Sequence, residues 1–367
     1  MIFRGLEEVA LSKRVSFLIA LMISILCIVG CSKTVLFDDG LSQKNQEILE
    51  NQQDDSEVIL VGFSQLGAES DWRNANTVSM KQAFSEDSKY RLLFEDGQQK
   101  QSNQITAIRR FIQQEVDYIV LAPVTEEGWD TVLQEAKDAG IPVILMDRMI
   151  SVQDESLYYC YVGSDYRLEG MKLTEWLNQY TLEKGIVAED IHIVNIQGSI
   201  GSTSQIGRTE SLRSAVKMYG WDLVAEECGE FTETKAREVM AGFLQEYDNI
   251  NVVYCENDNE AFGAITAIEA VGRTVGSDIE NGEIMVLAFD GISEKAVQYV
   301  RDGKITCISE CNPLHGPRVH TIITTLNVGG VIQKTSYVDE GIITANKTVK
   351  YIEVDNKQYE VTILDNK

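Results

Sequence analysis

The sequence predicts an α/β protein built from two doubly wound parallel-sheet lobes that are joined by a hinge. Short apolar segments rich in β-branched residues alternate with amphipathic segments along most of the chain after residue 57. The apolar segments are continuous, which is typical of parallel strands covered by helices on both faces. The alternation ends near residue 180 and restarts near residue 191, so the two batches of strands predict two sheets.

The first batch of elements runs to residue 180. Its expected strands cover residues 58–64, 90–94, 118–123, 141–146 and 158–162. Its expected helices cover residues 74–88, 101–114, 129–139 and 166–180. The helical period is clearest over 101–114, because Ile105, Ile108 and Ile112 fall on one face.

The second batch predicts a lobe of the same plan. Its expected strands cover residues 191–196, 221–227, 252–255, 284–289 and 305–309. Its expected helices cover residues 205–218, 232–246, 261–271, 293–301 and 315–327. Three of these helices are followed by Gly220, Gly272 and Gly303, at the position where glycine commonly ends a helix. The tail after residue 347 predicts strand and loop that either complete the second sheet or lie against the hinge.

Length and charge limit the function. A chain of 367 residues is too long for one compact core and suits two lobes. The net charge of −25 makes nucleic acid an unexpected partner. With three histidines and no Cys/His cluster, neither a metal site nor a cofactor is expected. The five cysteines after Cys31 mostly lie in apolar segments, which indicates core filling, with a possible disulfide bridge left unassigned.

The first 30 residues predict a signal peptide. Arg4, Lys13 and Arg14 precede an apolar run of about 15 residues, shorter than the ~20 needed to span a bilayer. The run ends in Gly30 and Cys31, which resembles a bacterial lipobox and implies cleavage before Cys31 and a diacylglycerol anchor on its sulfur. An uncleaved anchor helix is the alternative. The polar residues 31–56 predict a flexible tether, so we expect a membrane-anchored lipoprotein in the periplasm or on the outer face of the cell membrane.

Polar and aromatic side chains follow the first expected strand. Glu69, Trp72 and Arg73 supply a carboxylate, an aromatic plate and a guanidinium fork within five residues. Sugars stack their apolar faces on rings and bond through hydroxyls to planar charged groups. The alternative interpretation of the same residues is a capped helix start with a half-buried tryptophan.

Charged or amide residues also stand at the ends of later strands. Ligands of open parallel sheets bind at these carboxyl ends. A single aspartate there is weak support, because aspartate also caps helices. The set as a whole predicts a cleft lined from two lobes, by Asp96, Asp147, Arg148, Asn257, Asp258, Asp290 and Glu310.

Residues 57–325 resemble the periplasmic sugar-binding proteins of ribose/galactose ABC importers, most closely the galactofuranose-binding component. Two motifs carry the narrower likeness, SQLGAESDWR at 64–73 and DGQQKQ at 96–101. Two further segments, IPVILMDR at 141–148 and FDG at 289–291, belong to the whole sugar-binding class. The other matching segments are GSIGSTSQIGR at 198–208, GEFTETK at 229–235 and ENDNEAFG at 256–263. The resemblance implies the type I periplasmic binding protein fold.

The resemblance also implies the ligand contacts. In the first lobe they are Glu69, Trp72, Arg73, Asp147 and Arg148. In the second lobe they are Arg208, Phe231, Asn257, Asp290 and Glu310. By this likeness the two aromatic rings sandwich the sugar and the arginines donate to its hydroxyls. Hinge crossings are implied near residue 163, after 310 and near 329, which divides the chain into 57–163 with 311–329, and 164–310 with 330–367.

The resulting hypothesis is an extracytoplasmic binding protein, not an enzyme, that captures galactofuranose or a similar pentose or hexose. An ABC permease is the expected partner, and a monomer is the expected state. A sugar-sensing protein that feeds a membrane receptor or kinase is the alternative, and a sugar-processing enzyme is a third. Asp71 and Asn74 flank the first motif and are candidates for tuning selectivity.

Overall fold

Two sheets organise the residues that the computed structural model describes, which are 58–365. The first sheet has the strand order β11-β5-β4-β3-β1-β2, and all its pairs are parallel. Its strands are β1 (Ile59–Gln65), β2 (Tyr90–Asp96), β3 (Tyr118–Leu121), β4 (Val143–Met146), β5 (Cys160–Gly163) and β11 (Thr335–Tyr337). The first batch of expected strands is therefore confirmed as one parallel sheet.

The second sheet has the order β13-β14-β12-β10-β9-β8-β6-β7. Its parallel part consists of β6 (His192–Gln197), β7 (Asp222–Cys228), β8 (Val252–Cys255), β9 (Met285–Asp290) and β10 (Cys307–Glu310). The C-terminal strands β12 (Ile342–Thr344), β13 (Tyr351–Val354) and β14 (Lys357–Ile363) extend it, and β12 pairs antiparallel with β10. The tail after residue 347 thus completes the second sheet.

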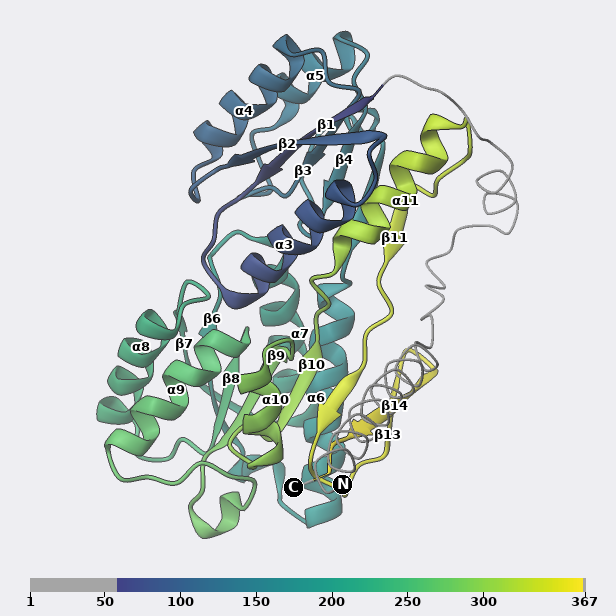
Figure 1. Cartoon of the computed structure of the whole chain (residues 1–367). Helices are drawn as coiled ribbons and strands as arrows, with labels where there is room; N and C mark the ends of the chain where they lie inside the picture. The colour runs from purple at the N-terminus through teal and green to yellow at the C-terminus, as the bar shows by residue number, and fades with distance from the viewer. Residues whose placement is uncertain (1–57, 366–367) are drawn as a thin grey trace, which may run out of the picture. The chain divides into compact units, whose positions relative to one another are not determined.

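Helices cover both faces of each sheet (Figure 1). The first sheet is covered by α3 (Asp71–Ser85), α4 (Gln101–Gln113), α5 (Asp130–Asp138) and α11 (His315–Asn327). The second is covered by α6 (Tyr166–Lys184), α7 (Thr203–Tyr219), α8 (Glu233–Glu246), α9 (Asp258–Ala270) and α10 (Glu294–Arg301). Short 3-10 turns lie at η1 (Glu155–Leu157), η2 (Ala188–Asp190) and η3 (Ile279–Asn281). Six of these α-helices have an N-cap residue whose side-chain oxygen accepts a hydrogen bond from a backbone N–H of the first turn. The N-cap residues are Ser70, Asp165, Ser202, Thr232, Asn257 and Ser293.

Each sheet has a core on both faces, which explains its continuous apolar strands. In β3, Val120 packs in the core beneath α3 and α11, while its neighbours Ile119 and Leu121 pack in the core beneath α4 and α5. The second sheet repeats this arrangement, with one core under α8–α10 and another under α6 and α7. The β13–β14 hairpin adds apolar side chains to the core beneath α6 and α7. Parallel strands buried on both faces need no polar alternation.

The chain passes between the two sheets three times. The crossings lie between β5 and α6, between β10 and α11, and between β11 and β12. The first two agree with the crossings expected near residues 163 and 310. The third was expected near 329, but β11 still pairs with β5 in the first sheet, so this crossing spans residues 338–341. Gly329, with φ of +74°, follows the C-terminus of α11 without leading out of the lobe.

Several sequence expectations concern residues outside the described range. The signal peptide, the lipidation residue Cys31 and the tether belong to this group. Within the described range, Cys160, Cys255, Cys307 and Cys311 are buried and Cys228 is partly buried. All five are free thiols and none of them forms a disulfide. The interpretation as core filling holds for Cys160, Cys255 and Cys307, which lie in the apolar cores. None of the helices between residues 58 and 365 has the length and apolarity of a transmembrane span.

Candidate ligand-binding cleft

A cleft lies between the carboxyl ends of the two sets of strands. Its lining consists of Glu69, Ser70, Trp72, Arg73, Asp147, Arg148, Tyr166, Ser204, Arg208, Phe231, Asn257, Asp290 and Cys311. Nine of the ten ligand contacts implied by the resemblance are in this lining, whereas Asp96 and Asp258 of the strand-end set are not. Glu310, the tenth, is also outside it; its carboxylate accepts a hydrogen bond from the Gly341 N–H at the third crossing.

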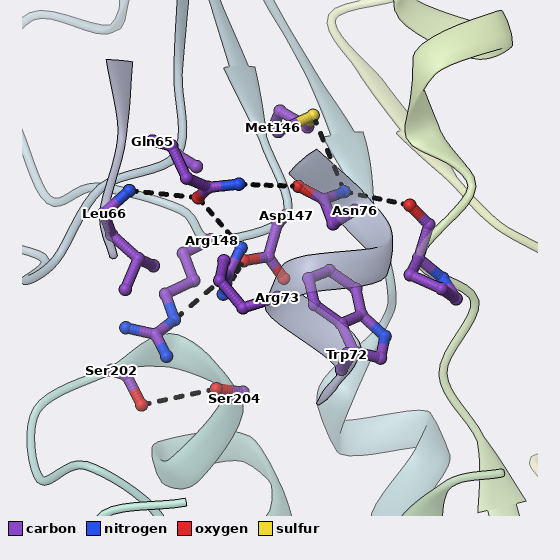
Figure 2. Close-up of polar contacts among 12 residues, drawn as sticks. Gln65, Leu66, Trp72, Arg73, Asn76, Met146, Asp147, Arg148, Ser202 and Ser204 are labelled. Carbon is purple, nitrogen blue, oxygen red and sulfur yellow. Dashed lines mark hydrogen bonds and ion pairs between the residues drawn. The ribbon is translucent and has the colours of Figure 1, made fainter. Parts of the chain in front are cut away.

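The first-lobe wall is built on the start of α3. Ser70 caps this helix through its hydroxyl, which places Trp72 and Arg73 in the first turn facing the cleft. The guanidinium of Arg73 pairs with Asp147 Oδ2 at 2.6 Å (Figure 2). It also pairs with Glu69 Oε1 at 3.1 Å. Burial alone would raise the pKa of Asp147, but the charges of Arg73 and Arg148 lower it below its usual range. The wall therefore holds a fully ionised pair.

Arg148 is the second guanidinium of this wall. It lies 3.8 Å from Glu69 Oε1 and donates to the carbonyl of Val124 at 3.3 Å. Burial and the neighbouring Arg73 lower its pKa, although its group stays a cation. Arg148 Nε and Glu69 Oε2 are buried and have no hydrogen-bond partner among the described residues. Such groups can bind the hydroxyls of a polar ligand.

The second-lobe wall centres on Arg208 of α7. Its Nε and Nη2 lie 2.9 and 2.8 Å from Glu169 Oε2, and its Nη2 lies 3.6 Å from Asp290 Oδ1. The guanidinium carbon also lies 4.4 Å from the ring centre of Phe289. Asp290 ends β9 with a left-handed φ of 87°. Burial raises the pKa of Asp290 to about 7, because Arg208 offsets only part of the desolvation.

Two aromatic rings complete the cleft. Trp72 is 5% exposed and donates from its indole N–H to the carbonyl of Cys311 at 2.7 Å. Phe231 is equally buried, and its backbone carbonyl accepts a hydrogen bond from the Asn257 side chain at 3.1 Å. Asn257 also caps α9, so its side chain positions Phe231 as well as lining the cleft.

Sequence reasoning missed four lining residues. Ser70 and Ser204 carry hydroxyls, while Tyr166 and Cys311 stand beside the first two crossings. Tyr166 donates its hydroxyl hydrogen to the backbone and side-chain oxygens of Asp147, which ties α6 to the first-lobe wall. The crossings carry no motif of their own, and only their place in the fold brings these side chains to the cleft.

Two lobes of parallel sheet that enclose a small polar cleft with aromatic walls define a bilobed binding protein. The chain belongs to the periplasmic binding protein family, whose domain model matches residues 61–314. It is 39% identical over 264 residues to the galactofuranose-binding protein YtfQ of Escherichia coli, covering 71% of this chain and 79% of that protein. These findings confirm the resemblance to sugar-binding proteins and the type I fold.

Solved structures of similar proteins agree. A Mycobacterium smegmatis protein in complex with β-D-fucofuranose is 37% identical, with a TM-score of 0.72 over 78% of this chain and 91% of its own. The binding component of the arabinose ABC transporter from Shewanella sp. ANA-3, bound to L-arabinofuranose, is 36% identical, with a TM-score of 0.70 over 77% and 91%. The family consists of extracytoplasmic transport proteins rather than enzymes, as the sequence predicted.

Proposed function

We propose that this chain captures a monosaccharide in its furanose ring form and delivers it to an ABC permease. The carrying observation is the composition of the cleft. Three guanidinium groups, from Arg73, Arg148 and Arg208, share the lining of the cleft with the rings of Trp72 and Phe231. This lining suits a sugar ring that is stacked on aromatic faces and held by charged groups at its hydroxyls.

The similar proteins support the ring form. One is named for galactofuranose, and two solved structures hold fucofuranose and arabinofuranose. These sugars differ in what the exocyclic carbon carries, while the five-membered ring is common to all three. We propose that Glu69, Asp147, Asp290 and Asn257, which also line the cleft, bind the hydroxyls of the sugar. Glu310 lies outside the cleft lining, and we do not propose it as a contact.

Capture by two lobes requires a hinge. We propose that residues up to 163, together with 311–337, move as the first lobe, and that 164–310 and 342–365 move as the second. We further propose that Cys31 carries a lipid anchor and that the protein works as a monomer. Replacement of Cys31 by alanine then moves the protein from the membrane fraction to the soluble fraction of its host.

Titration calorimetry of the purified chain against galactose, fucose, arabinose, ribose and glucose tests the capture. We expect micromolar or tighter binding of a sugar that populates the furanose ring, and the recovered sugar should be chemically unchanged. Phe231→Ala should weaken binding by about thirtyfold, because it removes roughly 2 kcal/mol of apolar contact.

Two variants serve as controls for this titration. Trp72→Phe and Trp72→Ala both lose the hydrogen bond to the Cys311 carbonyl. Because Trp72→Phe keeps an aromatic face, it should bind the sugar more tightly than Trp72→Ala. Tyr351→Ala alters an exposed ring on the β13–β14 hairpin and should leave binding unchanged. Absence of binding to every sugar, or conversion of the sugar to another product, would contradict the proposed function.

A further inference from the structure

A chain of buried amides connects the second crossing to the cleft (Figure 2). The Asn76 side chain donates to the carbonyl of Pro313 at 2.9 Å, and its oxygen accepts from Gln65 Nε2 at 2.9 Å. The Gln65 oxygen then accepts from the backbone N–H of Leu66 at 3.0 Å and from Arg73 Nη1 at 3.3 Å. Asn76 and Gln65 are completely buried.

The hydrogen-bond partners of Asn76 and Gln65 fix which way each side-chain amide is turned. Because the Pro313 carbonyl can only accept, Asn76 must turn its NH₂ towards it and its oxygen towards Gln65. Gln65 must then turn its own oxygen towards Arg73. The Nε and Nη2 of Arg73 already pair with Glu69 and Asp147, so Gln65 supplies the acceptor for the third nitrogen and fixes the plane of the guanidinium.

We infer that Gln65 and Asn76 are positioning residues for sugar capture, acting through Arg73. A guanidinium held on three nitrogens presents its remaining donors in one direction. The link ends at Pro313, within the crossing between β10 and α11, so the direction of Arg73 is tied to the backbone of the hinge. Trp72 is tied to the same segment through Cys311, so both cleft side chains of α3 share one support.

Two alanine variants of α3 separate positioning from general stability. Ser79 also bonds α3 to the segment after the second crossing, through the Gly316 N–H, but it has no contact with Gln65 or Arg73 among the hydrogen bonds of the described residues. We expect Asn76→Ala to weaken sugar binding by about tenfold, mainly through faster dissociation. Ser79→Ala should stay within about twofold of the unmodified chain, even if both variants lower the melting temperature.

A third variant adds a pH readout. Asn76→Asp keeps the acceptor for Gln65 and can donate to Pro313 only when its carboxyl is protonated. Its affinity relative to the unmodified chain should therefore recover as the pH falls. Equal losses in Asn76→Ala and Ser79→Ala, or a pH-independent ratio for Asn76→Asp, would contradict the inference. It rests on the proposed capture, and failure of the unmodified chain to bind any sugar would identify that separate error.

A second, independent feature lies where the three crossings meet. Glu169 of α6, Cys311 of the second crossing and Glu340 of the third place one oxygen or sulfur each within 4.8 Å of one another. Glu340 Oε1 accepts from the Ser164 hydroxyl at 2.8 Å and from the Asn312 N–H at 2.6 Å. Glu169 Oε1 is buried without a hydrogen-bond partner among the described residues, although Glu169 Oε2 binds Arg208.

Charges around this cluster are unbalanced. The buried cations here are Arg208, shared between Glu169 and Asp290, and Lys172, which donates to the backbone carbonyl of Glu340. The other titratable groups that face the cluster are Tyr161, Tyr166, Glu310 and Asp339. Two carboxylates at this distance and burial cannot both be ionised without a further cation.

We propose that Glu169 and Glu340 share one proton in the closed protein, and that this proton is taken up from solvent when the sugar is captured. The proton forms a hydrogen bond between Glu169 and Glu340, beside the hydrogen-bonding neighbour that Glu169 has in the Cys311 thiol. Because the two carboxyls belong to different segments that meet at the hinge, opening the lobes separates and hydrates them. Burial raises the pKa of both carboxyls in the closed form, that of Glu340 well above its usual range.

The sign of the effect follows from these directions. A carboxyl with a raised pKa in the closed form holds its proton where the open form is already ionised. Closure then binds a proton at pH values above the ordinary carboxyl pKa of about 4.3. Sugar affinity is therefore highest at low pH and falls as the pH rises through the raised pKa values.

Calorimetric titration of the sugar in two buffers of different ionisation enthalpy measures this uptake. Glu340→Gln mimics the protonated state, since its amide can donate to Glu169 Oε1 while its oxygen still accepts from Ser164 and Asn312. We expect this variant to take up fewer protons than the unmodified chain and to lose part of the pH dependence. Glu183→Gln, an exposed change on the same helix α6, is the control that should keep the full uptake.

Carbon-13 NMR of labelled glutamate carboxyls in the sugar-saturated chain observes the shared proton directly, with the sugar-free chain as its reference. A carboxyl that titrates above the ordinary glutamate range and disappears in Glu340→Gln supports the shared proton. Ordinary titration of both carboxyls, or equal proton uptake in the unmodified chain and Glu340→Gln, would contradict it. Zinc binding that releases protons and is lost in Glu340→Gln would also contradict it, by showing a metal site.

Discussion

The two walls of the cleft are built from the same kinds of side chain, but their charges are balanced differently. On the first-lobe wall, Arg73 and Arg148 face Glu69 and Asp147, so cations and carboxylates are matched. On the second-lobe wall, Arg208 alone faces an excess of buried carboxyls, which are Glu169, Asp290, Glu256 and Glu260. The first wall is therefore ionised and fixed, whereas the second holds protons.

The pKa directions follow this balance. Arginine charges keep the pKa of Asp147 low in spite of complete burial. Burial raises the pKa of Asp290 to about 7 and that of Glu256 to about 7, although each has partners that lower it in part. A fixed wall can present the same donors at every pH, and a protonated wall makes the second lobe responsive to pH.

The largest difference should appear when one aspartate of each wall is changed to asparagine. Asp147→Asn leaves Arg73 and Arg148 with Glu69 alone, and removing one partner of a buried ion pair costs about 3–5 kcal/mol. Asp290→Asn should cost less than about 1 kcal/mol near pH 7, because the carboxyl it replaces is already about half protonated. Urea unfolding of both variants measures these costs.

Sugar titration of the same pair is the functional counterpart. Asp147→Asn should lose most of its sugar affinity, and Asp290→Asn should retain more. Equal destabilisation by the two substitutions would show that the walls do not differ in ionisation.

The pH dependence of stability is the next largest effect. Asp290 and Glu256 have pKa values of about 7 in the folded chain, against ordinary values of 3.8 and 4.5. Between the ordinary pKa of each carboxyl and its folded-state pKa of about 7, the group is ionised in the unfolded chain and protonated in the folded chain. Folding therefore binds protons, and the free energy of unfolding falls as the pH rises. Below about pH 4 this contribution is fully present.

Urea unfolding between pH 5 and pH 8 checks this trend. Stability should decline by more than about 1 kcal/mol across the range, and the decline should be smaller in Glu256→Gln. A stability that is constant or increases over this range would contradict the assignment of protons to the second wall.

Sequence patterns predicted the order of strands and helices and the candidate site residues at strand ends and on the first loop, whereas Arg208 and Phe231 were implied only by the resemblance. The remainder depends on tertiary placement. β11 has three half-exposed or exposed residues and no apolar run, so its membership of the first sheet was not predictable. Tyr166 and Cys311 reach the cleft only because the crossings converge there, and the shared acid cluster combines residues up to 171 positions apart, as Glu169 and Glu340 are.

A smaller effect should come from the support of Phe231 on the second wall. A Cβ atom added at Gly198 would lie 1.9 Å from the Cζ atom of the Phe231 ring. Gly198→Ala must therefore displace the ring, and we expect about tenfold weaker sugar binding without any change to a charged group. Gly242→Ala, on α8 with open space around its Cβ position, is the control that should bind normally. Normal binding by Gly198→Ala would show that the ring does not contact the sugar.

The smallest effect concerns a contact across the mouth of the cleft. The Asp71 N–H donates to Asn259 Oδ1 at 3.1 Å, and Asn259 Nδ2 donates to Asp71 Oδ2 at 3.3 Å. These reciprocal bonds join the starts of α3 and α9, one from each lobe, at an exposed position. Asp71→Ala should speed sugar release by about two- to fivefold, since exposed hydrogen bonds contribute roughly 0.5–1 kcal/mol.

Stopped-flow fluorescence measures that release rate. Asn74→Ala, an exposed change in the same turn of α3, should leave it unchanged. Equal rates for Asp71→Ala and the unmodified chain would remove Asp71 from the closing mechanism and return it to the group of selectivity candidates.

Carbon-13 NMR of the full chain with labelled galactose reports directly on the ring form that the cleft holds. Free galactose is mostly pyranose, so selective capture enriches a minor species that its anomeric resonance identifies. We expect the bound resonance to be that of the furanose and the sugar to be released unchanged. A bound pyranose, or a new product in solution, would contradict furanose capture by a binding protein.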